Sequence, residues 1–214
     1  MSKTFENWKN KGQPAEFSHH KGSTSRKSDE VWMKNTEGHL KSFGYDKDDF
    51  VGKKIIDLGA GSKLRTKWFN DPYIIAIEPL ADKFKSISFC DLDEADEVYS
   101  EPAEKFLENL EEQVDAIMCI NVLDHCYDAE VIMENCYKYL KDGGEMLLSV
   151  DLHGGRDDKH PIKLNNHILK TLVRKIGFNI KREYPITMGL YSGHCSAITL
   201  VLDKNLEEEW WEEQ

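Results

Sequence analysis

The stretch KKIIDLGAGSKL, residues 53–64, constrains the fold of this chain more than any other segment. A short apolar run enters a turn that carries Gly59 and Gly61, and Asp57 stands just ahead of these glycines. Glycines tolerate backbone angles that other residues rarely adopt, and they let a ligand approach the main chain closely. A buried strand that runs into such a turn is typical of α/β folds that bind a ligand at a helix N-terminus.

Downstream of this turn, apolar runs alternate with segments of helical spacing. The helical spacing is clearest at residues 128–141 and 165–177, and KLRTKWF at 63–69 indicates a shorter helix. Near-continuous apolar runs separated by helices predict a parallel sheet that is covered on both faces. The runs that predict its strands lie at residues 53–58, 73–78, 114–121 and 145–150.

The last two apolar runs are connected in a different way. Residues 178–188 and 194–203 have no helix between them, only a loop with Gly189 and Gly193, so we expect them to pair antiparallel. The predicted fold class is therefore α/β. It is a Rossmann-like three-layer sandwich whose mostly parallel sheet ends in an antiparallel C-terminal hairpin.

Composition divides the chain into three parts. Residues 1–50 are polar and contain one clear helical pattern, with Ser28 as the expected N-cap and Gly44 as the stop. We expect an N-terminal helical arm over residues 1–50, a ligand-binding domain over 51–203 and an acidic tail over 204–214.

The net charge of −11 is unevenly distributed. Residues 1–67 hold 14 Lys and Arg against 9 Asp and Glu, whereas residues 68–214 hold 14 against 30. An acidic body of this kind repels nucleic acid, so no nucleic-acid partner is expected. The basic arm remains able to attract a small anionic substrate.

Cysteine content and hydropathy indicate the cellular setting. The five cysteines form no C-x-x-C pair, so neither a disulfide framework nor a zinc knuckle is expected. No stretch approaches the roughly 18 apolar residues of a membrane span, and the first residues lack the apolar core of a signal peptide. We expect a cytoplasmic protein, monomeric or homodimeric, with no membrane partner.

Three residues around the glycine turn indicate which ligand it takes. A dinucleotide-binding turn needs a third glycine for close packing around the pyrophosphate, and Leu64 stands in that place. Glu78 ends the next strand-like run, where a carboxylate can accept both hydroxyls of a ribose. Asp57 suits a cationic, amine-bearing ligand better than a pyrophosphate.

Five motifs in order resemble those of the class I S-adenosylmethionine-dependent methyltransferases, and the resemblance covers roughly residues 50–203. The matching segments are IIDLGAGS, IIAIEPL, SEPAEKF, VDAIMCINVLDHCYD and YLKDGGEMLLSVD, and LVRKIGFNIKREY resembles the helix and strand that follow in the family. The family's sheet has seven strands with a reversed last strand. The departures are Pro102 and the acidic stretch 91–97, which leave the adenine contacts less defined than the ribose contact.

The resemblance implies S-adenosyl-L-methionine as cofactor, with S-adenosyl-L-homocysteine as product, and no metal. The glycine turn would face the amino-acid end of the cofactor, Glu78 its ribose and the third motif its adenine. The residues expected to bind the cofactor are Asp57, Gly59, Ala60, Gly61, Glu78, Pro79, Glu101, Ala103, Asn121 and Val122. Asn121, Asp124 and Asp128 offer oxygen ligands for magnesium, but Asn121 is expected to face the cofactor and Asp128 to cap a helix.

The acceptor side is expected around histidines at the carboxyl end of the sheet. A hydroxyl or amine acceptor often needs its proton removed, and histidine suits that task near neutral pH. His125 follows the fourth motif and His160 lies in the loop after the fifth, so both are candidate catalytic residues. In this family an N-terminal segment commonly forms a lid over the acceptor, and the candidate substrate-binding residues are His20, Arg26 and His153.

The predicted function is methyl transfer to a small molecule, with an oxygen of an anionic metabolite or glycan precursor as the expected acceptor. A phosphorylated, carboxylated or nucleotide-linked acceptor fits the basic arm, and related members act in bacterial polysaccharide, sugar and secondary-metabolite pathways. Two alternatives stay open. One is an NAD-dependent oxidoreductase, which Leu64 opposes; the other is a catalytically silent methyltransferase fold that acts as a binding module.

Overall fold

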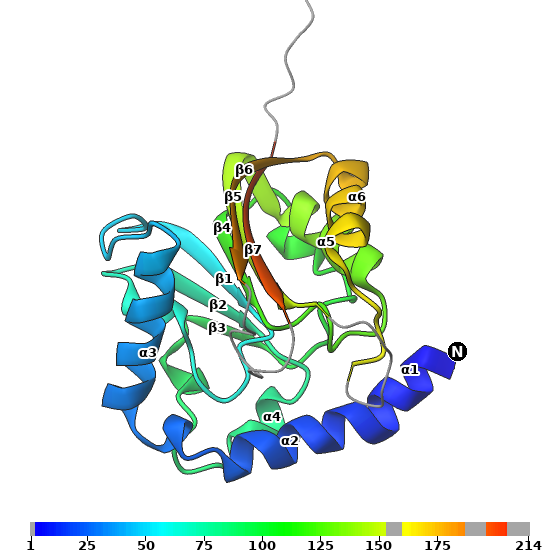
Figure 1. Cartoon of the computed structure of the whole chain (residues 1–214). Coiled ribbons are helices and arrows are strands. Elements are labelled where there is room, and N and C mark those ends of the chain that lie inside the picture. The colour runs from blue at the N-terminus through cyan, green and yellow to red at the C-terminus, as the bar shows by residue number, and fades with distance from the viewer. Residues whose placement is uncertain (1–2, 153–159, 187–195, 205–214) are drawn as a thin grey trace, which may run out of the picture.

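A computed structural model of the chain describes residues 3–152, 160–186 and 196–204. Seven strands form one sheet in the order β3-β2-β1-β4-β5-β7-β6 (Figure 1). Only β7 runs antiparallel to its neighbours, β5 and β6. The strands are β1 (Lys54–Leu58), β2 (Tyr73–Ile77), β3 (Glu97–Tyr99), β4 (Val114–Ile120), β5 (Leu140–Asp151), β6 (Phe178–Ile186) and β7 (Ala197–Lys204). The predicted mostly parallel sheet with a C-terminal antiparallel hairpin is confirmed.

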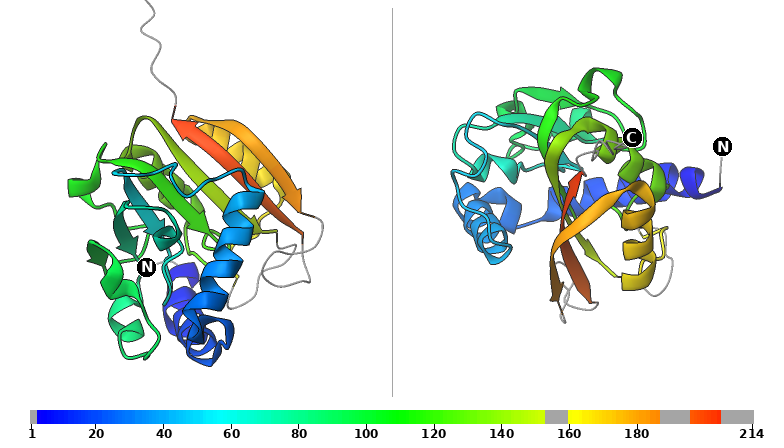
Figure 2. Two further views of the ribbon diagram at one scale, coloured as in Figure 1. Left: turned by 90° about the vertical axis from the view of Figure 1, so that its left-hand side faces the viewer. Right: turned by 90° about the horizontal axis from the view of Figure 1, so that it is seen from above.

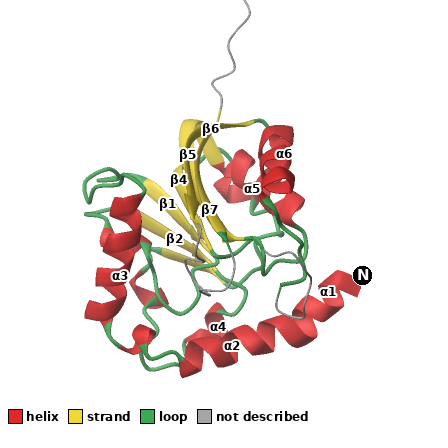
Figure 3. Ribbon diagram, viewed as in Figure 1, coloured by secondary structure: helices red, strands yellow, loops and turns green. Residues whose placement is uncertain are grey.

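Helices lie on both sides of this sheet (Figures 2 and 3). One side carries α5 (Ala129–Tyr139) and α6 (Asn166–Ile176), and the other carries α3 (Asp29–Ser42). In β1, Ile55 and Ile56 point to opposite faces because successive strand residues alternate, and both are fully buried. Each face of the sheet therefore has its own apolar core, which makes the three layers.

Local signals in the sequence set the helix ends. Ser28, Asp128 and Asn165 each accept a hydrogen bond from the backbone N–H three residues later and so cap α3, α5 and α6. Gly177 ends α6 in a left-handed conformation, with φ of 108°. These boundaries agree with the sequence predictions.

Two segments differ in extent from the sequence predictions. The short helix expected over 63–69 is present only as a 3-10 turn (Thr66–Trp68), and the N–H groups ahead of it donate to side chains: Asp91 accepts from Leu64, and Asp57 accepts from Arg65. Residues 3–22 of the expected helical arm are more helical than their sequence pattern indicated. They form α1 (Lys3–Asn7), a π-helical turn (Trp8–Gly12) and α2 (Gln13–Gly22), which run on into one another.

The N-terminal helices cross the end of the sheet where the parallel strands finish, next to the short helix α4 (Ala81–Phe84) (Figure 1). Ligands of open α/β sheets bind at that end, where the strand order reverses between β1 and β4. The arm is thus placed against the site that the sequence motifs predict. No helix within the described ranges has the length and apolar character that a membrane crossing requires.

Candidate functional site

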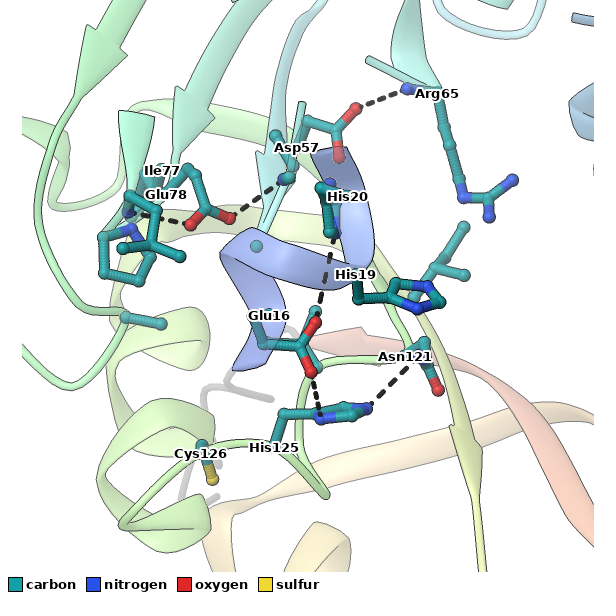
Figure 4. A pocket seen from close by; sticks show the side chains of 18 of the residues that line it. Glu16, His19, His20, Asp57, Arg65, Ile77, Glu78, Asn121, His125 and Cys126 are labelled. Carbon is teal, nitrogen blue, oxygen red and sulfur yellow. Dashed lines mark hydrogen bonds and ion pairs between the residues drawn. The ribbon is translucent and has the colours of Figure 1, made fainter. Parts of the chain in front are cut away.

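A cavity of about 780 Å³ lies between the carboxyl ends of β1, β2 and β4 and the N-terminal arm. The sheet side of its wall comes from the glycine turn, the end of β2 and the segment after β4. The opposite wall comes from α2, the 3-10 turn at Ser25–Lys27 and α3 (Figure 4). Residues far apart in the sequence therefore enclose one space.

Gly59 and Gly61 shape the floor of this cavity. Both have left-handed backbone angles, with φ of 62° and 65°. A Cβ atom on Gly59 would lie 2.6 Å from Cγ2 of Val122, and one on Gly61 would lie 2.2 Å from Cε1 of His20. Both the backbone conformation and the packing thus require glycine at these two positions, as the sequence predicted. Ala60, which lies between them, also lines the cavity.

Glu78 stands directly after β2 and is buried against the glycine turn. Its Oε2 accepts a hydrogen bond of 2.9 Å from the N–H of Gly61, and its Oε1 accepts one of 2.9 Å from the N–H of Leu80. Burial raises the pKa of this carboxyl to about 7 in spite of the two backbone bonds. The carboxyl thus titrates near neutral pH, and Pro79 beside it also lines the cavity.

Asp57 organises the loop that follows the glycine turn. Its Oδ2 accepts from the N–H groups of Arg65 (2.8 Å) and Thr66 (3.1 Å) and from the hydroxyl of Thr66 (3.0 Å). Burial raises the pKa of this carboxyl, and these hydrogen bonds oppose the rise. Asp57 lines the cavity as expected, but one of its oxygens is engaged within the protein.

The third motif is placed differently from its prediction. Ala103 lines the cavity, whereas Glu101 does not and instead forms an ion pair with Lys105. Glu104 lines the cavity, and its Oε1 accepts from the N–H groups of Tyr127 (2.8 Å) and Asp128 (3.2 Å). Burial raises the pKa of Glu104 to about 7. The sequence analysis missed Glu104, although a second acid three residues after Glu101 was visible in the motif.

Asn121 and Val122 follow β4 on the cavity wall. Asn121 has a φ of 60°, a conformation that residues other than glycine seldom adopt. Its backbone N–H donates to the carbonyl of Ser149 at 2.8 Å, which anchors the residue to β5 in this strained geometry. Such strain is concentrated at functional sites, where the surrounding structure holds it in place.

His125 lies at the centre of a polar cluster. Its Nε2 is 3.4 Å from Nδ2 of Asn121 and 3.5 Å from Oδ2 of the fully buried Asp124. The ring of His160 packs against it at a centroid distance of 4.6 Å. The structure thus brings the two predicted catalytic histidines together. Ligand atoms of Asp124, His125 and His160 lie within 4.8 Å of one another, a spacing that could also hold a metal ion.

Glu16 is the residue of this cluster that the sequence analysis missed. It projects from α2, and its Oε1 lies 3.3 Å from Nδ1 of His125 (Figure 4). The contacts to His125 lower the pKa of Glu16 to about 2 against the opposing effect of burial. Glu16 is thus ionised at neutral pH. Its spacing of four residues from His20 was the one signal in the sequence that pointed to it.

His20 holds the arm against the glycine turn. Its Nδ1 accepts a 3.1 Å hydrogen bond from the N–H of Ser62 and lies 3.0 Å from the Ser62 hydroxyl. Its ring stacks on Phe84 at 4.6 Å. Burial and the nearby charge of Arg26 lower the pKa of His20 to about 3, so the ring is neutral. Arg26 also lines the cavity, whereas His153 lies outside the described residues.

A comparison with known proteins identifies the family to which this chain belongs. A family model described as a methyltransferase domain matches residues 36–183, which is more than half of the chain. The chain belongs to the class I S-adenosylmethionine-dependent methyltransferases. This membership leaves the NAD-dependent alternative without support, in agreement with Leu64 at the third glycine position.

One curated relative is the ubiquinone biosynthesis O-methyltransferase of Pseudomonas putida (strain GB-1). It is 23% identical over 162 residues, which is 69% of this chain and 65% of the relative. A match to the protein of the same name from Pseudomonas entomophila (strain L48) covers only 44% of that protein. The chain thus spans about half to two thirds of the length of these relatives.

Solved structures show the same fold. The 1,6-didemethyltoxoflavin-N1-methyltransferase of Burkholderia thailandensis, with S-adenosylhomocysteine bound, has a TM-score of 0.66 at 14% identity and covers 96% of this chain and 92% of its own. The phosphoethanolamine N-methyltransferase 2 of Haemonchus contortus has a TM-score of 0.59 at 14% identity, with 81% of this chain and 53% of that chain covered. S-adenosylmethionine is the cofactor of this family.

Proposed function

We propose that this protein transfers a methyl group from S-adenosylmethionine to an oxygen of a small, anionic acceptor. The observation that carries the proposal is that a glycine cradle and a carboxylate-held histidine, His125, line one cavity. The family supplies the cofactor, and the name of the Pseudomonas relative supports oxygen as the methylated atom.

The cradle fits the cofactor on three observations. Gly59 and Gly61 line the cavity and have no side chains of their own, and the side chains of Val122 and His20 pack against them. Glu78 offers a buried carboxylate at the end of β2, where ribose hydroxyls are accepted. The cavity volume of about 780 Å³ lies within the roughly 300–1,000 Å³ typical of ligand pockets. Ala60, Pro79, Ala103, Asn121 and Val122 complete the proposed contacts.

His125 is proposed to take the proton from the acceptor. S-adenosylmethionine, when bound, supplies a methyl group activated by its sulfonium. As the acceptor oxygen bonds to the methyl carbon, the carbon–sulfur bond breaks, its electron pair stays on sulfur, and the acceptor proton passes to a ring nitrogen of His125. The carboxylates of Glu16 and Asp124 then stabilise the imidazolium that forms.

Nε2 is the proposed proton-accepting nitrogen. The ionised Glu16 faces Nδ1 at 3.3 Å and so favours a hydrogen on that atom, which leaves the lone pair on Nε2. His160 packs on the imidazole and borders the space that remains for the acceptor. We propose that His160 contacts the acceptor and restricts the motion of the His125 ring.

Residues 1–50 are proposed to act as a lid over this cavity. They supply Trp8, Glu16 and Trp32 to the wall opposite the strand ends, together with His20 and Arg26. The basic arm supports an anionic acceptor, because cationic side chains attract a small anion more strongly inside an enclosed site than in water. A phosphorylated or carboxylated metabolite or a glycan precursor has the required charge.

The direct test supplies methyl-labelled S-adenosylmethionine and a metabolite extract to the purified protein and identifies the labelled product by mass spectrometry. We expect a single labelled small molecule that carries a carboxylate or phosphate, with the label on oxygen. Calorimetry is carried out alongside this assay. It should show S-adenosylhomocysteine binding in the micromolar range and no binding of NAD. Absence of S-adenosylhomocysteine binding, or binding without transfer to any metabolite, would contradict the proposal and favour a binding module.

A further inference from the structure

Two arginines from different parts of the chain converge on one tryptophan in the cavity. The Cζ atom of Arg65 lies 4.4 Å from the centre of the Trp32 ring, and that of Arg26 lies 5.1 Å from it. Arg65 follows the glycine turn, Arg26 belongs to the 3-10 turn at Ser25–Lys27, and Trp32 belongs to α3. All three line the cavity. From this arrangement we infer that Arg26, Arg65 and Trp32 form a subsite for a carboxylate or phosphate group.

The indole is a fixed platform for both guanidinium groups. Trp32 is 6% exposed, and its Nε1–H donates a 3.3 Å hydrogen bond to the carbonyl of Leu64. That bond ties the ring to the loop that also carries Arg65. The quadrupole of the indole face attracts both cations, which orients the two arginines before any ligand binds.

The electrostatics favour an anion in the subsite. Burial and the nearby charge of Arg65 together lower the pKa of Arg26 to about 10, so both groups are cations that repel one another at neutral pH. Two carboxylates that line the cavity have other partners. Glu16 faces His125, and one oxygen of Asp57 accepts the N–H of Arg65. An anion near the two guanidinium groups would offset their repulsion.

The guanidinium of Arg26 retains a donor, and the hydrogen bonds that hold the two arginines in place are weak. Nη1 of Arg26 donates to Oγ of Ser23 at 3.3 Å, and Nη1 of Arg65 donates to Oγ1 of Thr36 at 3.4 Å. Both bonds are long and have neutral acceptors. The Nε atom of Arg26 is buried and has no hydrogen-bond acceptor among the described residues. A planar guanidinium presents its donors in a fork that matches carboxylate and phosphate oxygens.

Two groups could supply this anion if the proposed function holds. One is the carboxylate at the amino-acid end of the cofactor, because the backbone of Arg65 is bonded to Asp57 beside the glycine cradle. The other is a carboxylate or phosphate on the acceptor. Both have the same chemistry, so the experiment must separate the two sources.

The test measures binding by calorimetry in Arg26→Gln and Arg65→Gln. The probes are S-adenosylhomocysteine, 5′-methylthioadenosine, which lacks the amino-acid end, and inorganic phosphate added to protein saturated with 5′-methylthioadenosine. Lys27→Gln is the matched control, since it removes a neighbouring but exposed charge. Arg26→Lys keeps the charge and removes the fork, and thermal melting confirms that each variant folds.

If the cofactor supplies the anion, each glutamine variant lowers the affinity for S-adenosylhomocysteine at least tenfold and leaves the affinity for 5′-methylthioadenosine unchanged. If the acceptor supplies it, S-adenosylhomocysteine binding is unchanged and phosphate binding is lost. Folded variants that bind both S-adenosylhomocysteine and phosphate like the wild type would overturn the subsite. A wild-type protein that binds phosphate through these arginines but not S-adenosylhomocysteine would contradict the proposed function and leave the subsite standing.

Discussion

Oε1 of Glu16 lies 3.3 Å from Nδ1 of His125, so a helix near the N-terminus supplies a carboxylate to a histidine that follows the fourth parallel strand. The contact joins the arm to the proposed base. It exists only when α2 lies across the strand ends, as it does here. We therefore expect formation of the proposed base to be coupled to the position of the arm.

Replacement of Glu16 by Gln is expected to lower kcat about tenfold, a part of the roughly 10²–10⁴-fold effect of a general base. The acid limb of the kcat profile should move to lower pH, because the imidazolium loses a counter-charge. The KM for S-adenosylmethionine should stay close to the wild-type value. Glu6→Gln is the matched control, since Glu6 is exposed and its carboxylate contacts Asn10. An unchanged pH profile in Glu16→Gln would show that Glu16 acts only in packing.

Binding of S-adenosylhomocysteine is expected to weaken as the pH falls below about 7. The pKa of Glu78 is about 7 because of burial, and the proposed contact with the ribose hydroxyls uses its ionised form, so ligand binding should release a proton from the protonated carboxyl. Well below that pH, the Kd should rise about tenfold per pH unit.

Calorimetry between pH 5.5 and pH 8.5 checks this dependence on Glu78. In Glu78→Gln the affinity should be lower throughout, and the slope below pH 7 should disappear. Glu104 has a similar pKa of about 7 and lines the same cavity, so Glu104→Gln is the informative control. If Glu104→Gln loses the slope and Glu78→Gln keeps it, the proton released on ligand binding comes from Glu104, which would contradict the prediction.

Gly61→Ala is expected to detach α2 from the glycine turn. A Cβ atom there would lie 2.2 Å from the His20 ring, in addition to the strain of a left-handed backbone. Gly52 has nearly the same φ, 67°, with nothing within 4 Å of its Cβ position. Gly52→Ala therefore measures the backbone strain alone, about 1–2 kcal/mol.

Hydrogen exchange of residues 13–22 reports the difference between these two variants. Faster exchange is expected in Gly61→Ala and wild-type exchange in Gly52→Ala. Equal exchange in both single variants would contradict the close packing of His20 on Gly61.

Asp91→Asn is expected to destabilise the fold by about 3 kcal/mol. Asp91 is buried, its Oδ2 lies 3.0 Å from Nζ of the buried Lys63, and its Oδ1 accepts the N–H of Leu64 at 2.8 Å. The amide keeps the shape and that backbone hydrogen bond but leaves a buried ammonium with less compensation, which costs about 3–5 kcal/mol in comparable pairs. Because Asp29 also contacts Lys63, we expect the lower end of that range.

Urea denaturation measures this change in the free energy of unfolding. Asp93→Asn is the matched control, because Asp93 is highly exposed and its contact with Lys85 is 3.7 Å long. It should change stability by less than about 1 kcal/mol. A similar small change in Asp91→Asn would show that the buried pair is dispensable.

Removal of metal ions is expected to leave the turnover rate unchanged. The side chains of Asp124, His125 and His160 have a spacing that could hold a metal ion, but the proposed mechanism uses them for proton transfer. Dialysis against a chelator followed by the labelled-methyl assay is the measurement. A rate that falls on dialysis and returns with Mg²⁺ or Zn²⁺ would replace proton transfer by metal coordination.

The sequence predicted the sheet well because its signals are local. Alternating apolar runs and helical spacings specify strands and helices one at a time, and the residues at strand ends then meet at one edge of the sheet. Gly59, Glu78, Asn121 and His125 line the same cavity for that reason.

Residues that reach the cavity from elsewhere could not be located in this way. Glu16 and Arg65 are positioned by how the arm and the loop after β1 fold against the sheet, and polar residues on exposed helices give no comparable pattern. The helix predicted over 63–69 is shorter than expected, and the contacts of Asp57 and Asp91 with the N–H groups ahead of it are tertiary. Glu101 and Glu104 were both visible, but only the path of the chain after β3 distinguishes the acid outside the cavity from the one that lines it.

In this molecule the N-terminal arm lines the cavity, and other segments form the sheet. Residues 3–28 line the cavity and contribute no strand, so substitutions there change the ligand environment without altering the registry of the sheet. We expect acceptor preference to follow this segment when it is exchanged between related proteins. Changes in this short stretch can therefore alter which ligand fits while the pairing of the strands is kept.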